Sequence, residues 1–300
     1  MVYKVENQEC LKRYETYLRE EKKASQNTLS SYMRDIRQLA EYLETEADTD
    51  IVSATEKELE GYISYLRENG KSAATVSRCV ASMKNLYSYL GIHQIIRQSP
   101  AIKLTTERGA QKLPQILSSQ EVDLLLEQPN CVDAKGYRDK AMLELLYATG
   151  MRVTELIDLN VEDVNLPGAT VRCHSRNKER VIPIYPAAVK ALDNYIRLVR
   201  PQMLADLNNP TLFVNVGGER MSRQGFWKLI KHYQKKANID KDITPHMLRH
   251  SFAAHLVENG ADLHDIQEML GHADVASTHV YSQLVNKKIE DSYRRAHPKA

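Results

Sequence analysis

Residues 169–184 read ATVRCHSRNKERVIPI and stand apart from the rest of the 300-residue sequence. Two runs of β-type residues, ATVRCH and RVIPI, flank the polar centre SRNKE, which is the pattern of a β-hairpin. The sequence on both sides of this stretch has helical periodicity instead. We therefore predict a mainly α-helical fold with a small β-sheet.

Apolar residues recur every three or four positions around the hairpin and predict helices before and after it. The helices expected in the second half of the chain cover residues 121–127, 139–149, 186–199, 222–237, 245–258 and 263–270. Together with the hairpin they predict a mixed α/β domain over residues 113–300.

Residues 1–97 show only the helical pattern. The expected helices cover residues 8–22, 28–44, 55–69 and 72–91. Four helices of this length suit a small helical domain. Residues 98–112 then break the periodicity with a proline, a glycine and several polar residues, so we expect an interdomain linker there.

The composition excludes several classes of protein. The chain has 41 Lys and Arg against 39 Asp and Glu, a net charge of +2, and no apolar run of about 18 residues that could span a bilayer. The N-terminus, MVYKVENQECLKRYE, lacks the apolar core of a signal peptide, so we expect a cytoplasmic protein without membrane contact. The cysteines Cys10, Cys79, Cys131 and Cys173 are far apart, which favours neither a zinc site nor a disulfide framework.

The charge is distributed unevenly along the chain. Residues 172–249 hold 15 basic and 6 acidic side chains, a surplus of +9, whereas residues 111–171 sum to −5 and residues 250–300 to −2. A strongly basic segment suits the binding of phosphate groups, and a solvated basic surface is the alternative. The small net charge therefore does not exclude a nucleic-acid partner.

Arg152 lies in the stretch TGMRVTEL, between two expected helices. Gly150 ends the first helix, and Arg152 precedes or opens the second. Free N–H groups and the helix dipole at such a position favour an oxyanion, and a guanidinium reinforces them. The alternative is an ordinary surface ion pair between Arg152 and Glu155, three residues apart.

A second cationic group is expected in the stretch TPHMLRH. Pro245 fixes the start of a helix, and His246 and Arg249 share one helix face at three-residue spacing. An imidazole and a guanidinium so placed are able to bind one phosphate. A purely structural histidine is the alternative.

His272 and Tyr281 follow near the C-terminus. His272 lies in LGHAD, where a helix turns, and Tyr281 comes nine residues later. A tyrosine hydroxyl has an ordinary pKa of about 10, so a nucleophilic tyrosine needs nearby cations to stabilise the phenolate. Since the chain has 16 tyrosines, Tyr281 taken alone would be structural.

In this order and spacing, Arg152, His246, Arg249, His272 and Tyr281 resemble the catalytic residues of the tyrosine recombinases, the phage integrase family. The stretches that carry the resemblance are RDKAMLELLYATGMRVTEL, TPHMLRHSFAAHL, LGHADVASTHVY, SYRRAHPKA and NTLSSYMRDIRQLAEYL. They are closest to the Xer-type recombinases of bacterial chromosomes. The resemblance covers nearly the whole chain.

The resemblance implies two domains that clamp duplex DNA: a core-binding, SAM-like helical domain and a catalytic domain. It also implies site-specific strand exchange. Tyr281 would attack a backbone phosphate and leave a 3′-phosphotyrosyl bond and a free 5′-hydroxyl. Because one phosphodiester is exchanged for another, neither a metal ion nor another cofactor is expected.

The resemblance also implies roles for the remaining site residues. Arg152 and Arg249 would hold the non-bridging phosphate oxygens by fixed charge. His246 would move a proton near the tyrosine, and His272 would hydrogen-bond the phosphate. Glu155 would orient Arg152 rather than act as a base.

The hairpin departs from the family pattern. The family places a general-acid lysine in a context like Lys-Gly-Asn-Lys-Glu-Arg, and in alignment on Asn-Lys-Glu-Arg this position holds Ser175. A serine hydroxyl does not release its proton near neutral pH. We therefore assign the role to Lys178, with Arg176 supplying only charge as the alternative. A protein that binds and synapses DNA but cleaves it poorly is the corresponding alternative function.

The resemblance further implies a homo- or hetero-tetramer, with another recombinase in the second case, on double-stranded DNA with paired inverted half-sites. The C-terminal tail from Asn286 would pack into a neighbouring protomer. The residues expected to contact DNA are Arg34, Arg37, Thr75, Arg78, Lys84, Arg176, Arg180, Arg220 and Arg223. Chromosome dimer resolution and integration or excision of a mobile element share this chemistry, and a type IB topoisomerase-like relaxing enzyme is a third interpretation.

Overall fold

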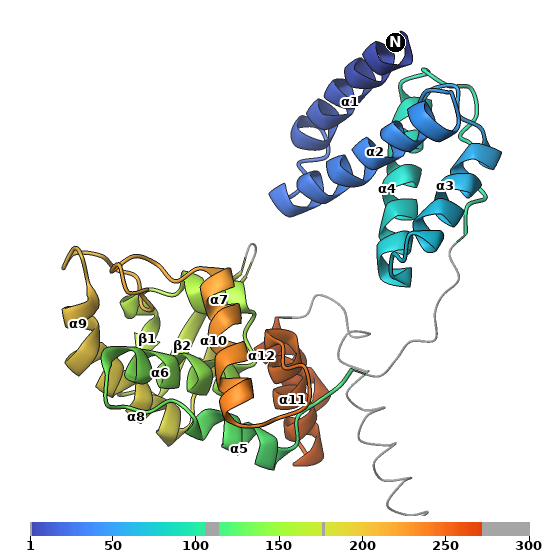
Figure 1. The fold of residues 1–300 in the computed structure, drawn as a ribbon. Coiled ribbons are helices and arrows are strands. Elements are labelled where there is room, and N and C mark those ends of the chain that lie inside the picture. The colour runs from blue at the N-terminus through green and yellow to red at the C-terminus, as the bar shows by residue number, and fades with distance from the viewer. Residues whose placement is uncertain (1, 106–113, 176–177, 272–300) are drawn as a thin grey trace, which may run out of the picture. The chain divides into compact units, whose positions relative to one another are not determined.

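The computed structural model describes residues 2–105, 114–175 and 178–271 (Figure 1). Its elements are α1 (Val2–Glu20), α2 (Gln26–Glu46), α3 (Glu56–Glu68), α4 (Ala73–Ile92), α5 (Ser119–Glu127), α6 (Ala134–Thr149), α7 (Val153–Asp158), the 3-10 turn η1 (Val161–Asp163), β1 (Val164–Asn165), β2 (Thr170–Ser175), β3 (Lys178–Pro183), α8 (Pro186–Asn194), the π turn η2 (Tyr195–Val199), α9 (Arg200–Met203), α10 (Arg223–Lys236), α11 (Pro245–Glu258) and α12 (Leu263–Leu270). The chain divides into two compact units, residues 1–111 and 112–300. A mainly helical fold with one small sheet is therefore confirmed.

The first unit packs α1 to α4 around one hydrophobic core, and α2 shows how the sequence builds it. The helix begins after Ser25, whose Oγ accepts the backbone N–H of Thr28 at 3.1 Å. Its residues Ile36, Leu39 and Leu43 are completely buried. Their three- and four-residue spacing places them on one face of the helix. The predicted apolar stripe is thus the face that packs in the core.

A buried polar group joins α2 to α4. The carboxylate of Asp35 is almost completely buried, and it accepts hydrogen bonds from Arg78 Nη2 and Ser82 Oγ, both at 2.8 Å. A buried carboxylate needs such partners because it has lost its hydration. The two hydrogen bonds fix the position of α4 along α2.

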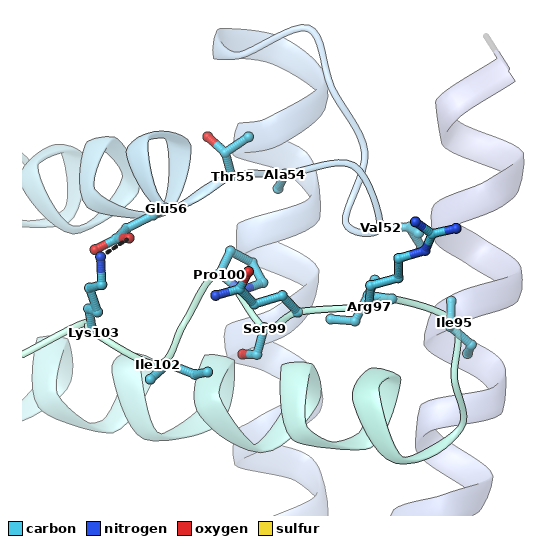
Figure 2. A pocket seen from close by; sticks show the side chains of 12 residues that line it. Val52, Ala54, Thr55, Glu56, Ile95, Arg97, Ser99, Pro100, Ile102 and Lys103 are labelled. Carbon is cyan, nitrogen blue, oxygen red and sulfur yellow. Dashed lines mark ion pairs between the residues drawn. The ribbon is translucent and has the colours of Figure 1, made fainter.

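The segment after α4 returns along the first unit. Ala101 and Leu104, which lie in the stretch predicted as linker, are 0% and 2% exposed and belong to the core of this unit. The same segment lines a pocket of about 500 Å³ that also has Val52 and Thr55 in its wall (Figure 2). Lys103 and Glu56, which also line this pocket, form an ion pair with 3.6 Å between Nζ and Oε2. The chain up to Leu104 therefore packs as part of the first unit.

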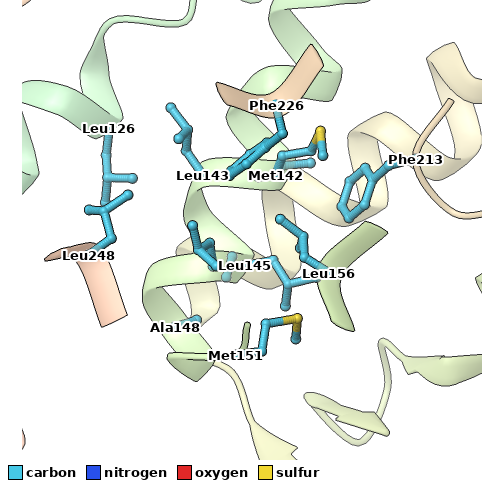
Figure 3. Packing of buried hydrophobic residues seen from close by; sticks show 14 of the residues in the cluster. Leu126, Met142, Leu143, Leu145, Ala148, Met151, Leu156, Phe213, Phe226 and Leu248 are labelled. Carbon is cyan, nitrogen blue, oxygen red and sulfur yellow. The ribbon is translucent and has the colours of Figure 1, made fainter. Parts of the chain in front are cut away.

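The core of the second unit is built around α6. Almost every side chain of this helix between Gly136 and Thr149 is buried, and Met142, Leu143 and Leu145 pack with Phe213 and Phe226 from later in the chain (Figure 3). A helix buried on nearly all sides has no solvent face, so it is stable only when other elements surround it.

The helix α6 begins five residues before the predicted start at Asp139. Asp133 is its N-cap, and Asp133 Oδ1 accepts the backbone N–H of Gly136 at 2.7 Å. A Cβ at position 136 would lie 1.7 Å from the backbone oxygen of Asn130, so only glycine fits there. The first turn is thus set by its cap rather than by an apolar stripe.

The sheet is antiparallel in the order β1-β2-β3, and β2 and β3 form the predicted hairpin. Val171, Cys173 and Ile182 are buried, whereas Val181 is 63% exposed. Alternate residues of a strand face opposite sides of a sheet. One face of the hairpin therefore packs on the core. Backbone pairing extends to Ser175 opposite Lys178, and residues 176–177 lie outside the described residues.

Within the described part of the chain, no helix combines the length and the apolar character needed to cross a bilayer. The four cysteines carry free thiols. Burial raises the pKa of Cys10 and of Cys173 to about 11, so both are neutral near pH 7. Neutral buried thiols are weak nucleophiles and weak metal ligands.

Candidate active site

Arg152 lies between α6 and α7. Gly150 ends α6 in the left-handed conformation with φ +56°, and Arg152 is the N-cap of α7. Its backbone N–H donates to Glu155 Oε2 at 2.7 Å, and its Nη1 lies 3.2 Å from Glu155 Oε1. The Arg152 side chain is 40% exposed. The predicted pair with Glu155 forms, and it leaves the guanidinium at the surface.

Arg249 is buried on α11, where it joins the ends of two other helices. Its Nη1 donates to the carbonyl oxygen of Gly150, and its Nη2 donates to that of Leu270, both at 2.7 Å. The last carbonyls of a helix lack intrahelical partners and carry partial negative charge. The Arg249 guanidinium therefore caps α6 and α12 together.

Arg180 on β3 is the third guanidinium of the group. Its Nη1 and Nη2 donate to Glu155 Oε1 and Oε2 at 3.0 and 2.8 Å, and its Nε donates to the carbonyl oxygen of Met269 at 2.6 Å. Burial alone raises the pKa of Glu155, but hydrogen bonds from Arg180 and from the Arg152 backbone, with both guanidinium charges, bring that pKa below its ordinary value. Glu155 is therefore an ionised carboxylate between two arginines.

His246 lies at the start of α11, which Thr244 caps by accepting the backbone N–H of Met247 at 3.0 Å. The pKa of His246 is lowered, first by loss of hydration and then by the positive charges of Arg249, Arg152 and Arg223. This imidazole is therefore neutral near pH 7 and lies within the field of three guanidinium groups.

The structure places Arg152 and Arg249 near His246, close enough for both guanidinium charges to act on the imidazole. The chain reaches this group again at Gly271, which ends α12 in the left-handed conformation with φ +62°. His272 is the next residue. His272, Tyr281 and Arg176 lie outside the described residues, so their assignments stay predictions.

The structure describes the backbone of Lys178 and Ser175 but not their side chains. The two residues are directly opposite each other at the end of the hairpin. The next pair of this kind is Cys173 opposite Arg180, two positions along each strand. The backbone of Lys178 therefore occupies the alternate position of β3 next to that of Arg180. The Arg180 side chain itself reaches Glu155.

The residues expected to contact DNA fall into two groups. Arg34, Arg37, Lys84 and Arg223 are exposed, although Arg37 lies 3.6 Å from Glu15. Thr75 is partly buried, and its backbone N–H donates to the Oγ of the helix cap Ser72 at 3.2 Å.

The second group has partners inside the protein. Arg78 pairs with Asp35, and Arg180 binds Glu155. Arg220 donates through Nη1 to the carbonyl oxygen of Ile157 at 2.6 Å and through Nη2 to Asn160 Oδ1 at 2.9 Å. These internal roles were not predicted from the sequence. For Arg180 a signal was present, because it is two residues from the apolar Ile182 and so on the same face of β3.

A metal site is not evident in the part of the chain that the structure describes, where no three His, Cys, Asp or Glu side chains come close enough together to hold an ion. The charged groups of the site are instead cations around one carboxylate. Such a group suits an anion with several oxygens, such as a phosphodiester.

Comparison with protein-family models gives two matches that together cover most of the chain. The model described as "Phage integrase family" matches residues 115–288. The model described as "Phage integrase, N-terminal SAM-like domain" matches residues 11–93. The two matches fall in the two compact units of the structure.

Individual proteins are similar over nearly the full length. A tyrosine recombinase XerD of Staphylococcus epidermidis is 41% identical over 97% of this chain and 99% of its own. The tyrosine recombinase XerD of Oceanobacillus iheyensis is 44% identical over 95% of this chain and 96% of its own. Among solved structures, the XerH site-specific recombinase bound to palindromic difH substrate superposes with a TM-score of 0.76 at 21% identity, over 94% of this chain and 83% of that one.

Proposed function

The chain belongs to the phage integrase family of tyrosine recombinases, which cleave and rejoin DNA, and on this premise we propose how its residues carry out the reaction. The observation that carries the proposal is the convergence of Arg152, His246 and Arg249 at the point where the chain leads to His272. Two fixed guanidinium groups and a neutral imidazole are what an attack on a phosphodiester requires of a site.

The proposed reaction begins at Tyr281. Its hydroxyl oxygen attacks the phosphorus of a backbone phosphate while the bond from phosphorus to the 5′-oxygen breaks. His246 takes up the tyrosine proton, which a neutral imidazole is able to do near pH 7. Arg152 and Arg249 hold the non-bridging oxygens, and His272 hydrogen-bonds the phosphate. The 5′-hydroxyl of the partner strand then gives up its proton and attacks the same phosphorus, the bond from phosphorus to the Tyr281 oxygen breaks, and His246 returns the proton to the tyrosine.

The leaving 5′-oxygen needs a proton, and we assign its supply to Lys178. Backbone pairing supports this assignment, because it places Lys178 on β3 directly opposite Ser175, the position that aligns with the lysine of the family pattern. Ser175, directly opposite, has no suitable proton near neutral pH. If neither residue supplies it, the protein binds and synapses DNA but cleaves it slowly.

We further infer that the substrate is double-stranded DNA with paired inverted half-sites, bound by a tetramer. A relative named XerD matches 97% of this chain, and one similar structure is a recombinase on a palindromic site. A palindromic site reflects the symmetry of a paired protein assembly. Xer-like resolution of chromosome dimers is the favoured role, and integration or excision of a mobile element uses the same chemistry.

Tyr281→Phe tests the nucleophile. The wild-type protein is incubated with candidate duplex sites, and the products are separated on a denaturing gel. A covalent protein–DNA adduct is expected from the wild type and none from the variant, while both bind DNA equally. Tyr65→Phe, at a tyrosine whose side chain is 42% exposed, is the control. An adduct that survives in Tyr281→Phe contradicts the assignment, and relaxation of supercoiled DNA without site preference favours the topoisomerase-like alternative.

Lys178→Ala tests the general acid on a nicked suicide substrate. Release of the 5′-hydroxyl should slow by about 10²- to 10⁴-fold, the usual contribution of proton transfer. A substrate with sulfur in place of the bridging 5′-oxygen should restore the rate, because a thiolate leaves without a proton. Lys190→Ala on α8 is the control. Normal release of the 5′-hydroxyl by Lys178→Ala rejects the role.

A further inference from the structure

We propose that Arg180 is a positioning residue that keeps Arg152 available to the phosphate by occupying both oxygens of Glu155. The proposal rests on the function proposed above, in which Arg152 binds the scissile phosphate. It replaces the expectation that Arg180 itself contacts DNA. What matters is how one carboxylate is shared between two arginines.

Glu155 is shared unequally. Arg180 donates to both of its oxygens, at 3.0 and 2.8 Å, whereas the Arg152 side chain reaches only Oε1, at 3.2 Å. The Arg180 and Glu155 side chains are 11% and 7% exposed. A two-point guanidinium–carboxylate pair is the strongest common form of this interaction, and burial excludes the water that would compete with it. The stronger partner of Glu155 is therefore Arg180.

The unequal sharing of Glu155 determines how much of the Arg152 charge is available to a phosphate. Because Arg180 balances the negative charge of Glu155, that carboxylate offsets little of the positive charge of Arg152, and most of the Arg152 donors stay available to an incoming anion. A buried carboxylate does not remain without a cation. Without Arg180, Glu155 would bind Arg152 at two points, and that guanidinium would be turned inward and neutralised.

Arg180 also holds the chain that leads into the C-terminal part of the site. Its Nε donates to the carbonyl oxygen of Met269, and a Cβ at Gly271 would lie 3.1 Å from its Nη1. The guanidinium therefore packs against the backbone directly before His272. One side chain thus links β3, which carries Lys178, to Glu155 on α7 and to the end of α12, after which His272 follows in the sequence.

Arg180→Gln tests the proposal, and Arg172→Gln, an exposed arginine on the neighbouring strand β2, is the matched control. Adduct formation is measured in a single turnover at saturating DNA. We expect Arg180→Gln to cleave about 10- to 100-fold more slowly than the wild type, the usual effect of losing an orienting partner. DNA affinity should be unchanged, and the control should cleave at the wild-type rate. A wild-type rate for Arg180→Gln overturns the proposal.

A substrate with a neutral methylphosphonate at the mapped cleavage position separates positioning from a general structural defect. This substrate lacks one charged oxygen, so Arg152 contributes less to its cleavage. The defects of Arg152→Ala and Arg180→Gln, each relative to the wild type, should both become at least about tenfold smaller on it. An Arg180→Gln defect of the same size on both substrates overturns the proposal, as does an Arg152→Ala defect that does not change.

The outcomes separate this proposal from the function on which it rests. If the wild type forms no adduct with any duplex, the proposed function fails and this inference fails with it. If the wild type forms the adduct and Arg180→Gln matches it, only the inference fails. Should Arg180→Gln not fold, Arg180→Lys takes its place. That variant keeps one charge without the two-point geometry, so its defect should be smaller but should shrink on methylphosphonate in the same way, and a defect that does not shrink overturns the proposal.

Discussion

At the scale of single residues, His246 shows how neighbours from several elements determine one side chain's chemistry. Its spacing from Arg249 on α11 is visible in the sequence. The charge of Arg223, on α10, acts on it only in the folded protein. Loss of hydration and three cations all favour the neutral imidazole, so the pKa of His246 lies below its ordinary value near 6.5.

The pH dependence of cleavage follows from this shift. A histidine that must accept a proton is active when neutral, so cleavage should persist as the pH falls below 6.5 and decline only at the lower pKa of the folded protein. Arg223→Gln removes one cation, which should raise the pKa of His246 and move the decline to higher pH. The measurement is the single-turnover rate at saturating DNA between about pH 5 and 8.

Lys228→Gln, on the exposed surface of the same helix α10, is the control for this experiment. It removes the same charge but is not among the groups that shift His246. Its acid limb should coincide with that of the wild type. An Arg223→Gln profile with an unshifted acid limb would show that His246 does not govern the rate.

The sequence predicted some residue contacts and missed others for a physical reason. The pair of Arg152 with Glu155 follows from three-residue spacing on one helix, so it was predictable. The ion pair between Glu155 on α7 and Arg180 on β3 joins residues 25 positions apart in the sequence, and it depends on how these two elements pack. Local periodicity carries no information about such a crossing. The sequence alone therefore predicts a DNA contact for Arg180, a basic residue in the hairpin, rather than an internal ion pair.

At the scale of elements, helix ends position the site. Gly150 ends α6 at positive φ, and a Cβ there would lie 2.3 Å from the ring of Phe252. Its carbonyl oxygen accepts Arg249. The turn therefore needs glycine for its conformation and for its close contact, and the same turn delivers Arg152 to the site.

Gly150→Ala should lower the free energy of unfolding by about 2–5 kcal/mol, because a methyl group at positive φ is strained and also overlaps Phe252. Cleavage should fall as well, since the carbonyl that holds Arg249 moves. Urea unfolding and the adduct assay measure the two effects.

Gly260→Ala separates the two causes in Gly150→Ala. Gly260 also has positive φ, at +87°, but no atom lies within 4 Å of the place that a Cβ would take. The free energy of unfolding of Gly260→Ala should fall by about 1–2 kcal/mol from backbone strain alone, and the cleavage rate should not change. Equal losses in both variants would exclude the Phe252 overlap as a cause.

Helix boundaries were predictable where a cap stands beside an apolar stripe. The helices expected from residues 55 and 245 begin there in the structure: Thr55 caps α3 in a capping box with Glu58, and Pro245 opens α11 directly after its cap Thr244. The start of α6 was missed because its first turn, AKGYR, is polar and contains glycine. There the cap Asp133 acts without a local apolar pattern, and burial by the rest of the unit sustains the helix.

At the scale of the whole molecule, the residues that the structure describes form two main cores, one in each unit. In the segment between the units, the sequence pattern and the observed packing disagree. Residues 98–112 look like a linker because their apolar residues follow no helical or strand period. Ala101 and Leu104 are nevertheless buried in the first core. An irregular segment is able to contribute to a core through single side chains, and sequence periodicity does not detect this.

A fragment of residues 1–105 should therefore be more stable than one of residues 1–97. The difference should be about 2–3 kcal/mol, close to the value of burying one leucine. Urea unfolding of both fragments measures it. Leu104→Ala in the longer fragment should lose most of the difference, whereas Ile102→Ala, at a side chain that is 66% exposed, should lose almost none. Equal stability of the two fragments would place the boundary before residue 98.

The double cap made by Arg249 has a consequence for how the protein tolerates variation. The same guanidinium that is assigned to the phosphate also completes α6 and α12. A genetic screen that selects only for abundant folded protein would therefore reject substitutions at Arg249 almost as strictly as a screen for recombination. The same screen would accept many substitutions at Arg152, whose side chain lies at the surface. Inactive but well-folded variants should accordingly be collected at position 152 and not at position 249.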